Sequence, residues 1–487
     1  MLVILLIDYQ LITMLFESIL PEISLEILGW LDDLSLSMLL FVSQSFNELV
    51  RKIPIKTPCV MKIIDRAAEQ GNLKLVIWRW DSGQTLTPMT FRSAISNGYI
   101  EIAEWLRSKQ CPEIYDVCDT AARSGFVNMM KWTREKKYQW TSLTFSTAAA
   151  SGHSEMLQWL LESGCPSDHL ACIAAAKNGH LNVIQWLRAY GFVPNSKVYH
   201  YAASRGHLDL LKWLHENNYP KDPAAHYYAA CKGHLEVLEW LCKNGFILDL
   251  LVCSNAARGG HLEILKWARE NGCPWDFRTY ISAACKGHFD IMKWARENGC
   301  PWNERVCAEV AHMGHLDILK WARENNCPWD VTTCYYAAHS NHFDILKWAH
   351  ENGCPWDAST CLCIASHGNL EILVWARENG CPWDDRVCST AALKGYLNIL
   401  IWARENGCSW SERTCSAAAQ SGYLNILIWA RANGCPWDEY TCQYAVETSN
   451  FEVLKWARTN GCRWTNQTRE LAIKNGFIDE TNDCDDK

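Results

Sequence analysis

Tryptophan recurs at one fixed interval through most of this chain. Fifteen tryptophans stand 27 residues apart, without an insertion or deletion between them: Trp78, Trp105, Trp132, Trp159, Trp186, Trp213, Trp240, Trp267, Trp294, Trp321, Trp348, Trp375, Trp402, Trp429 and Trp456. A period of this length is typical of a solenoid, in which similar supersecondary units stack side by side. Because 487 residues exceed what one compact core holds, we predict that a repeat array accounts for most of the chain.

One unit, residues 277–303, has the pattern of two short helices. The first is predicted at about Phe277–Lys286, and Gly287 ends it because glycine tolerates positive φ. The second is predicted at Phe289–Glu297 from apolar residues at helical spacing. Pro301 then prevents its continuation. The predicted fold class is therefore all-α.

These units resemble ankyrin repeats. The segment GHLEILKWARENG at Gly260–Gly272 is similar to the second helix of that family, and Ala-Ala and Gly-His pairs match the end of its first helix. The ankyrin period is about 33 residues, and the missing residues fall between Gly272 and Arg278, where the family builds a β-hairpin. The resemblance covers residues 59–478. It implies an ankyrin-like helical solenoid of about fifteen repeats with shortened hairpin loops.

Nineteen of the 25 cysteines fall in two columns of the repeat. The first column holds Cys111, Cys165, Cys273, Cys300, Cys327, Cys354, Cys381, Cys408, Cys435 and Cys462, and the second holds Cys118, Cys172, Cys253, Cys307, Cys334, Cys361, Cys388, Cys415 and Cys442. Other repeats have aromatic residues there, such as Phe192 and Tyr280. A zinc ligand does not tolerate this exchange, whereas a buried apolar position does. We interpret both columns as core packing by free thiols in a reducing compartment, over the alternatives of metal sites and disulfides.

A second tryptophan column follows a rule within the chain. Its members are Trp140, Trp275, Trp302, Trp329, Trp356, Trp383, Trp410, Trp437 and Trp464. In these repeats the residue after the first tryptophan is alanine or threonine, and in the others it is leucine or arginine. We interpret this as a volume exchange, in which the turn tryptophan folds back over the last turn of the second helix. This interpretation predicts a contact between Trp275 and Ala268. It also predicts that the turn tryptophans do not project into solvent.

A histidine column holds His153, His180, His207, His234, His261, His288, His315 and His342. Adjacent members are expected about 8–10 Å apart, too far to share a metal ion. We predict that these side chains make hydrogen bonds between loops. The chain has no Gly-rich phosphate loop, nucleophile elbow or His-Glu-x-x-His motif, and its reactive residues recur with the repeat. We expect no enzymatic activity and no bound cofactor or metal.

Composition narrows the class of partner. The net charge is −8 and no Lys/Arg-rich block occurs, which argues against nucleic acid or an anionic membrane as the main partner. The first residues, MLVILLIDYQLITML, contain Asp8 and lack a basic start, so they are not predicted to be a secretory signal. They are also too short to span a bilayer. Either Met1 or Met14 could begin the protein, and we expect it in the cytoplasm.

Four segments are expected from these patterns. They are an N-terminal extension (1–17), a small helical module (18–58), the repeats (59–478) and an acidic, disordered tail (479–487).

The helical module resembles an F-box. The residues that carry the resemblance, and that it implies would bind the ligase adaptor, are Leu20, Pro21, Ile23, Ile27, Leu31, Val42 and Phe46. The match is one residue short after Pro21, and Phe46 stands where the family often has tryptophan. An alternative remains open, in which three helices only cap the apolar face of the first repeat.

The resemblance to F-box proteins implies a substrate receptor for a cullin–RING ubiquitin ligase. The F-box would bind the small adaptor subunit, and the repeats would hold a target protein. The combination of an F-box with 27-residue repeats also resembles ankyrin proteins of large amoeba-infecting DNA viruses, where the target would be a host protein in the host cytoplasm. We expect a monomer. The alternative is an ankyrin-type scaffold or host-protein-binding protein with no link to ubiquitin.

Two variable columns of the first helix are candidates for target binding. They lie four residues apart and therefore on the same helix face. His312, Tyr335 and His339 are the predicted contacts, because aromatic and imidazole groups have no evident core role there. Neutral variation of a solvent-exposed surface explains the same pattern and remains an alternative.

Overall fold

The computed structural model of the chain describes residues 64–81 and 83–477. Every regular element in this part of the chain is an α-helix, and it contains no strand. The all-α prediction is therefore confirmed. The predicted helical module (18–58), the extension (1–17) and the tail (479–487) lie outside the described residues. No helix of the described part is long and apolar enough to cross a membrane.

The chain divides into two compact units, Met1–Ala225 and His226–Lys487. The sequence register does not mark this division, because Trp213 and Trp240 on either side of it keep the 27-residue spacing. Each unit is built from the same helical pairs and is described by itself.

In the first unit, the first helices of the pairs are α7 (Pro88–Ser96), α9 (Val117–Ser124), α11 (Ser142–Ala150), α13 (Leu170–Lys177) and α15 (Ser196–Arg205). The second helices are α6 (Leu73–Asp81), α8 (Ile100–Ser108), α10 (Val127–Glu135), α12 (Ser154–Glu162), α14 (Leu181–Ala189) and α16 (Leu208–Glu216).

In the second unit, the first helices are α17 (Ala225–Lys232), α19 (Leu250–Gly259), α21 (Arg278–Ala284), α23 (Glu304–Met313), α25 (Val331–His339), α27 (Ala358–Ser366), α29 (Asp385–Lys394), α31 (Glu412–Gln420), α33 (Glu439–Glu447) and α35 (Asn466–Lys474). The second helices are α18 (Leu235–Lys243), α20 (Leu262–Glu270), α22 (Phe289–Glu297), α24 (Leu316–Glu324), α26 (Phe343–Glu351), α28 (Leu370–Glu378), α30 (Leu397–Glu405), α32 (Leu424–Ala432) and α34 (Phe451–Thr459).

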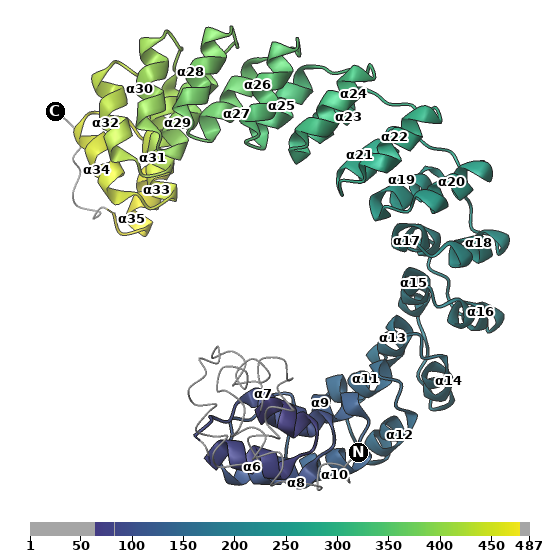
Figure 1. Cartoon of the computed structure of the whole chain (residues 1–487). Coiled ribbons are helices and arrows are strands. Elements are labelled where there is room, and N and C mark those ends of the chain that lie inside the picture. The colour runs from purple at the N-terminus through teal and green to yellow at the C-terminus, as the bar shows by residue number, and fades with distance from the viewer. Residues whose placement is uncertain (1–63, 82, 478–487) are drawn as a thin grey trace, which may run out of the picture. The chain divides into compact units, whose positions relative to one another are not determined.

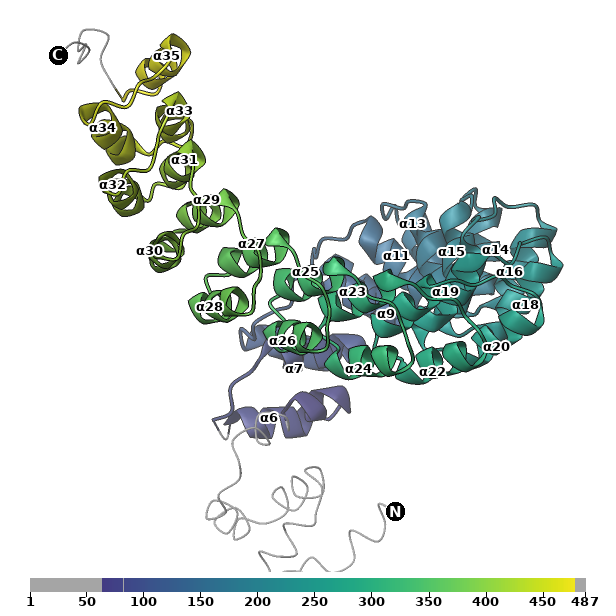
Figure 2. The ribbon, with the colours of Figure 1, turned by 90° about the horizontal axis from the view of Figure 1, so that it is seen from above.

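Within each unit the helices form two layers. The odd-numbered first helices stand side by side in one layer, and the even-numbered second helices form the other (Figure 1). Figure 2 shows the same two rows from α25 to α34 in a perpendicular view. The core lies between the layers. Its first-helix side is made of alanines such as Ala283 and Ala284, and its second-helix side of larger residues such as Ile291 and Met292.

The unit at residues 277–303 tests the predicted helix limits. The second helix was predicted at Phe289–Glu297, and α22 has these bounds. The first helix was predicted at Phe277–Lys286, but α21 is shorter, Arg278–Ala284. It ends two residues early, and the His288 N–H then donates to the Ala283 carbonyl, which closes a turn through Gly287 at φ 72°.

The recurring phrase Cys-Pro-Trp-Asp joins one repeat to the next. Its aspartate caps the following first helix: the Asp330 carboxylate accepts from the Thr332 N–H at 3.0 Å, and that of Asp357 accepts from the Ser359 N–H at 3.0 Å. Aspartate is a favoured N-cap because its side chain satisfies an N–H that has no partner within the helix. The short turn thus begins a helix where a longer ankyrin repeat has a hairpin.

All nineteen cysteines of the two columns are buried, and every cysteine that the structure describes is a free thiol. The columns meet, because the Cys334 thiol lies 3.9 Å from the Cys354 carbonyl oxygen and donates to it. In an equivalent place the Tyr280 hydroxyl donates to the Cys300 carbonyl at 3.0 Å. A thiol and a phenol therefore occupy the same interior position, which confirms the interpretation as core packing.

The turn tryptophans lie between the second helices of adjacent repeats. Trp275 packs edge-on against Trp294 of the next repeat, with ring centroids 5.7 Å apart. The Arg269 guanidinium covers the Trp275 ring at 4.3 Å and donates to the Cys273 carbonyl. We call this space, formed by the positions of Arg269, Trp275 and Trp294, the indole slot.

The same arrangement recurs through the chain. Arginine covers the turn tryptophan in seven other repeats: Trp140, Trp302, Trp329, Trp383, Trp410, Trp437 and Trp464. His350 takes that place over Trp356, at 3.6 Å. The half-buried indoles do not project into solvent, and Arg269 belongs to the last turn of its helix. The sequence did not show that the ring's partner, Trp294, belongs to the next repeat, and the contact with Ala268 stays a prediction.

Three members of the histidine column, His153, His180 and His207, make the predicted hydrogen bond between consecutive loops. The ring of His153 lies 3.0 Å from the Arg123 carbonyl oxygen of the previous repeat, measured from Nε2, and that of His180 lies 3.0 Å from the Ala150 carbonyl. The imidazole of His153 lies over Gly125, which has a left-handed backbone conformation. A Cβ atom at Gly125 would come within 2.7 Å of this ring. Glycine is required there both for its φ of 77° and for this close approach.

Candidate functional site

The three predicted target-binding residues lie together on the first-helix layer of the second unit. His339 is in α25, and its ring stacks on that of Tyr335 one turn earlier, with centroids 5.8 Å apart and planes 13° apart. His312 of α23 stacks on His339 with centroids 6.3 Å apart. His312 and His339 are exposed and Tyr335 is half-buried. The structure therefore places them in one continuous row.

Sequence reasoning missed other members of this row. Tyr336 packs edge-on against both His312 and Tyr335, at 5.5 and 5.2 Å between centroids. Ser340 and His312 share a hydrogen bond of 2.6 Å between Oγ and Nδ1. The Nε2 atom of His367 lies 2.9 Å from the His339 carbonyl oxygen. We define the histidine–tyrosine face as His312, Tyr335, Tyr336, His339, Ser340 and His367.

Local hydrogen bonds and neighbouring thiols shape the chemistry of this face. The Cys363 thiol and burial raise the pKa of Tyr335 above that of a free phenol. The face therefore offers aromatic rings, imidazoles and hydroxyl groups to a partner. Nowhere in the described ranges do three or more His, Cys, Asp or Glu residues come together as a metal site.

The arrangement suits recognition of a protein surface. Tyrosine and histidine combine an apolar ring with a polar tip, and aromatic residues are enriched in the energetically important parts of protein interfaces. Consecutive rings hold one another in place, which lowers the conformational entropy lost on binding.

The seven predicted adaptor-binding residues cannot be placed. Leu20, Pro21, Ile23, Ile27, Leu31, Val42 and Phe46 all lie outside the described residues. Their role stays a prediction.

Comparisons with known proteins bear on the repeats. The family model for ankyrin repeats in many copies matches residues 145–188 and 199–241. Among solved structures, the pentatricopeptide repeat protein PPR10 from maize is similar over 89% of this chain and 78% of its own, with 13% identity and a TM-score of 0.27. A search of curated proteins found no match.

The two matched ranges contain four of the five repeats in which leucine follows the first tryptophan: Leu160, Leu187, Leu214 and Leu241, but not Leu106. The repeats from Trp267 onward have alanine there and fill the indole slot instead. Residues 145–188 and 199–241 thus match the ankyrin-repeat model, and residues 64–81 and 83–477 form an all-helical repeat array.

Proposed function

We propose that the repeats bind a protein partner and that the histidine–tyrosine face is the contact surface. One observation supports this most: side chains with no role in the core, including His312 and His339, form an ordered and exposed row across adjacent first helices. The two tyrosines of this row belong to a residue type that is enriched in interface hot spots. The chain would act by binding and carry out no chemistry of its own.

A more specific role rests on the N-terminal sequence. We propose that the chain is a substrate receptor of a cullin–RING ubiquitin ligase in the cytoplasm, acting as a monomer. Residues 18–58 would bind the adaptor subunit and the repeats would hold the target close to the ligase. The resemblance to proteins of amoeba-infecting viruses supports a target from the host cell.

Two variants of the full chain separate these roles. Pro21→Ala with Ile27→Asp is expected to abolish co-purification with the small adaptor subunit, because it removes a helix start and an apolar contact. His312→Ala with Tyr335→Ala and His339→Ala should keep the adaptor and lose the target, with at least tenfold less target recovered. A matched control replaces three exposed acidic residues of the second helices, Asp317, Asp344 and Glu371, by alanine and is expected to retain both.

The outcomes distinguish the alternatives. If the unmodified chain does not bind the adaptor, the N-terminal segment is only a cap and the protein is a scaffold. If the three-alanine variant retains every partner of the unmodified chain, the histidine–tyrosine face is not the contact surface. Quantitative mass spectrometry of the co-purified proteins measures both.

A further inference from the structure

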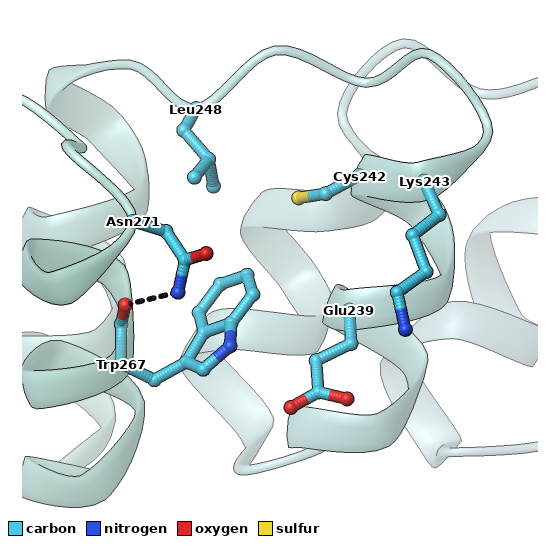
Figure 3. Close-up of a pocket in the computed structure, with 6 residues that line it drawn as sticks. All are labelled: Glu239, Cys242, Lys243, Leu248, Trp267 and Asn271. Carbon is cyan, nitrogen blue, oxygen red and sulfur yellow. Dashed lines mark hydrogen bonds between the residues drawn. The ribbon is translucent and has the colours of Figure 1, made fainter.

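The repeat that contains α18 lacks both residues that fill the indole slot of the next repeat, as does the repeat of α12, which has Leu161 and Ser167 at these positions. By the 27-residue register, Cys242 stands at the position of Arg269 and Leu248 at that of Trp275. In their place is a cavity of about 410 Å³ between α18 and α20. Figure 3 shows Trp267, Asn271 and Leu248 on one side of it, and Cys242, Lys243 and Glu239 on the other.

The indole of Trp267 is left without its usual partner. In the next repeat the equivalent Trp294 receives the edge of Trp275, but no other aromatic ring of the described part of the chain packs on Trp267. Its backbone carbonyl accepts a 2.8 Å hydrogen bond from the Asn271 side chain, which the filled slots also have, as at Asn298 and Trp294. This side of the slot therefore has the same local structure as in the filled repeats, and only the arginine and the turn tryptophan are missing.

Two other repeats without a turn tryptophan bring different groups to this place. Trp80 packs edge-on against Trp105 at 5.8 Å, and Arg188 covers Trp213 at 5.6 Å. The slot thus takes a ring or a cation where the chain supplies one. Cys242 and Leu248 supply neither, because both are short and uncharged; burial also raises the pKa of the Cys242 thiol to about 11.

We propose that this cavity binds a tryptophan side chain of a partner protein. The proposal rests on the protein-binding function proposed above and adds a second contact to it. The chain's own repeats show which group fits: in eight of them an indole meets the next repeat's first tryptophan edge-on. Edge-to-face indole pairs of this kind add about 0.5–1.5 kcal/mol beyond their buried area.

The size of the cavity suits this occupant. An apolar cavity of roughly 150 Å³ admits benzene, and ligand pockets in proteins span roughly 300–1,000 Å³. At about 410 Å³ the cavity has room for an indole together with part of a neighbouring side chain.

The lining carries one negative and one positive side chain, Glu239 and Lys243, and the carboxylate is the group that we propose meets this neighbouring side chain. Glu239 lines the cavity, whereas the equivalent residue in the next repeat is Lys266. The filled slots hold a guanidinium beside the indole, and here a carboxylate faces the same space. Lys243 also lines the cavity, on the same side as Glu239. A basic residue next to the partner's tryptophan would pair with Glu239.

The test uses the full chain and a capped peptide, acetyl-Gly-Trp-Arg-Gly-amide, with fluorine on the indole. The fluorine NMR signal is expected to broaden with the unmodified chain. Cys242→Arg with Leu248→Trp rebuilds the filled slot and should remove the broadening. Glu239→Lys, which introduces the residue of the next repeat, should weaken binding at least tenfold. Arg269→Cys with Trp275→Leu empties a second slot and should double the number of bound peptides.

Circular dichroism checks that each variant keeps its helices. Equal broadening in the unmodified chain and the filled variant, or none with the unmodified chain, overturns the proposal. Equal affinity for free fluoroindole also overturns it, since the occupant would then be a small planar molecule. The peptide does not involve the histidine–tyrosine face, so a variant with His339→Ala should still bind it. The cavity proposal can thus fail while target binding stands.

Discussion

Raising the pH from 7.5 to 9.5 is expected to lower the free energy of unfolding of the first unit by several kcal/mol. Burial raises the pKa of the Cys111 and Cys165 thiols to about 12 and that of Cys172 to about 11, whereas an unfolded thiol titrates near about 8.5. Between these values the folded state keeps protons that the unfolded state releases. Because the unfolded state binds fewer protons, stability falls as the pH rises.

The magnitude follows from the unfolded-state pKa. Each such thiol is expected to contribute a loss of about 1.4 kcal/mol at pH 9.5, and the three together about 4 kcal/mol, if they unfold together. Urea unfolding under reducing conditions, followed by circular dichroism at both pH values, measures this loss.

A substitution separates the thiols from other alkaline effects. Cys172→Ala should reduce the pH-dependent loss by about 1.4 kcal/mol, because one titrating group is removed. The control, Cys285→Ser, changes an exposed thiol of the second unit and should leave the loss unchanged. An unfolding free energy that is the same at pH 7.5 and 9.5 would contradict the burial of the columns.

Truncating Leu319 is expected to destabilise the second unit locally by about 2–5 kcal/mol, the cost of a cavity in a packed core. Leu319 belongs to α24 and is completely buried. Repeats contact only their neighbours, so the effect should be confined. For Leu319→Ala we expect amide hydrogen exchange in α24 to accelerate on the order of a hundredfold, with little change in α34 of the same unit.

Leu316→Ala is the matched control. Leu316 belongs to the same helix but is only half-buried, so its truncation should accelerate exchange much less. Equal acceleration throughout the second unit after Leu319→Ala would show that the unit unfolds as one body, against the expected local behaviour.

Most of the fold could be predicted from the 27-residue spacing of the tryptophans. Because every repeat has the same length, the helices predicted in one repeat can be transferred to the others. The bounds of α22 follow from the helical spacing of its apolar residues. The first helix was predicted too long at both ends, since Gly287 marked only the turn and α21 spans Arg278–Ala284. The N-cap role of Asp330 was not predicted, although an aspartate directly before a helix is a known start signal.

Contacts between repeats were harder to predict. The size of Ala268 indicates that space is available within one repeat, but not that Trp275 reaches Trp294 in the next. In the histidine–tyrosine face, too, contacts within one helix could be predicted and contacts between helices could not. The four-residue spacing placed Tyr335 and His339 on one side of α25, whereas the hydrogen bond between Ser340 and His312 depends on how α23 and α25 pack. Lateral packing follows from side-chain volumes on two helices at once.

One measurement tests most directly that the cysteine columns fill space in stacked helical pairs. The native chain is treated with a thiol-alkylating reagent, with and without a strong metal chelator, and the modified cysteines are identified by mass spectrometry. The nineteen column cysteines should stay unmodified in both samples while Cys285, the exposed thiol, reacts. Column cysteines that become reactive only with the chelator would show sulfur-bound metal and contradict the account.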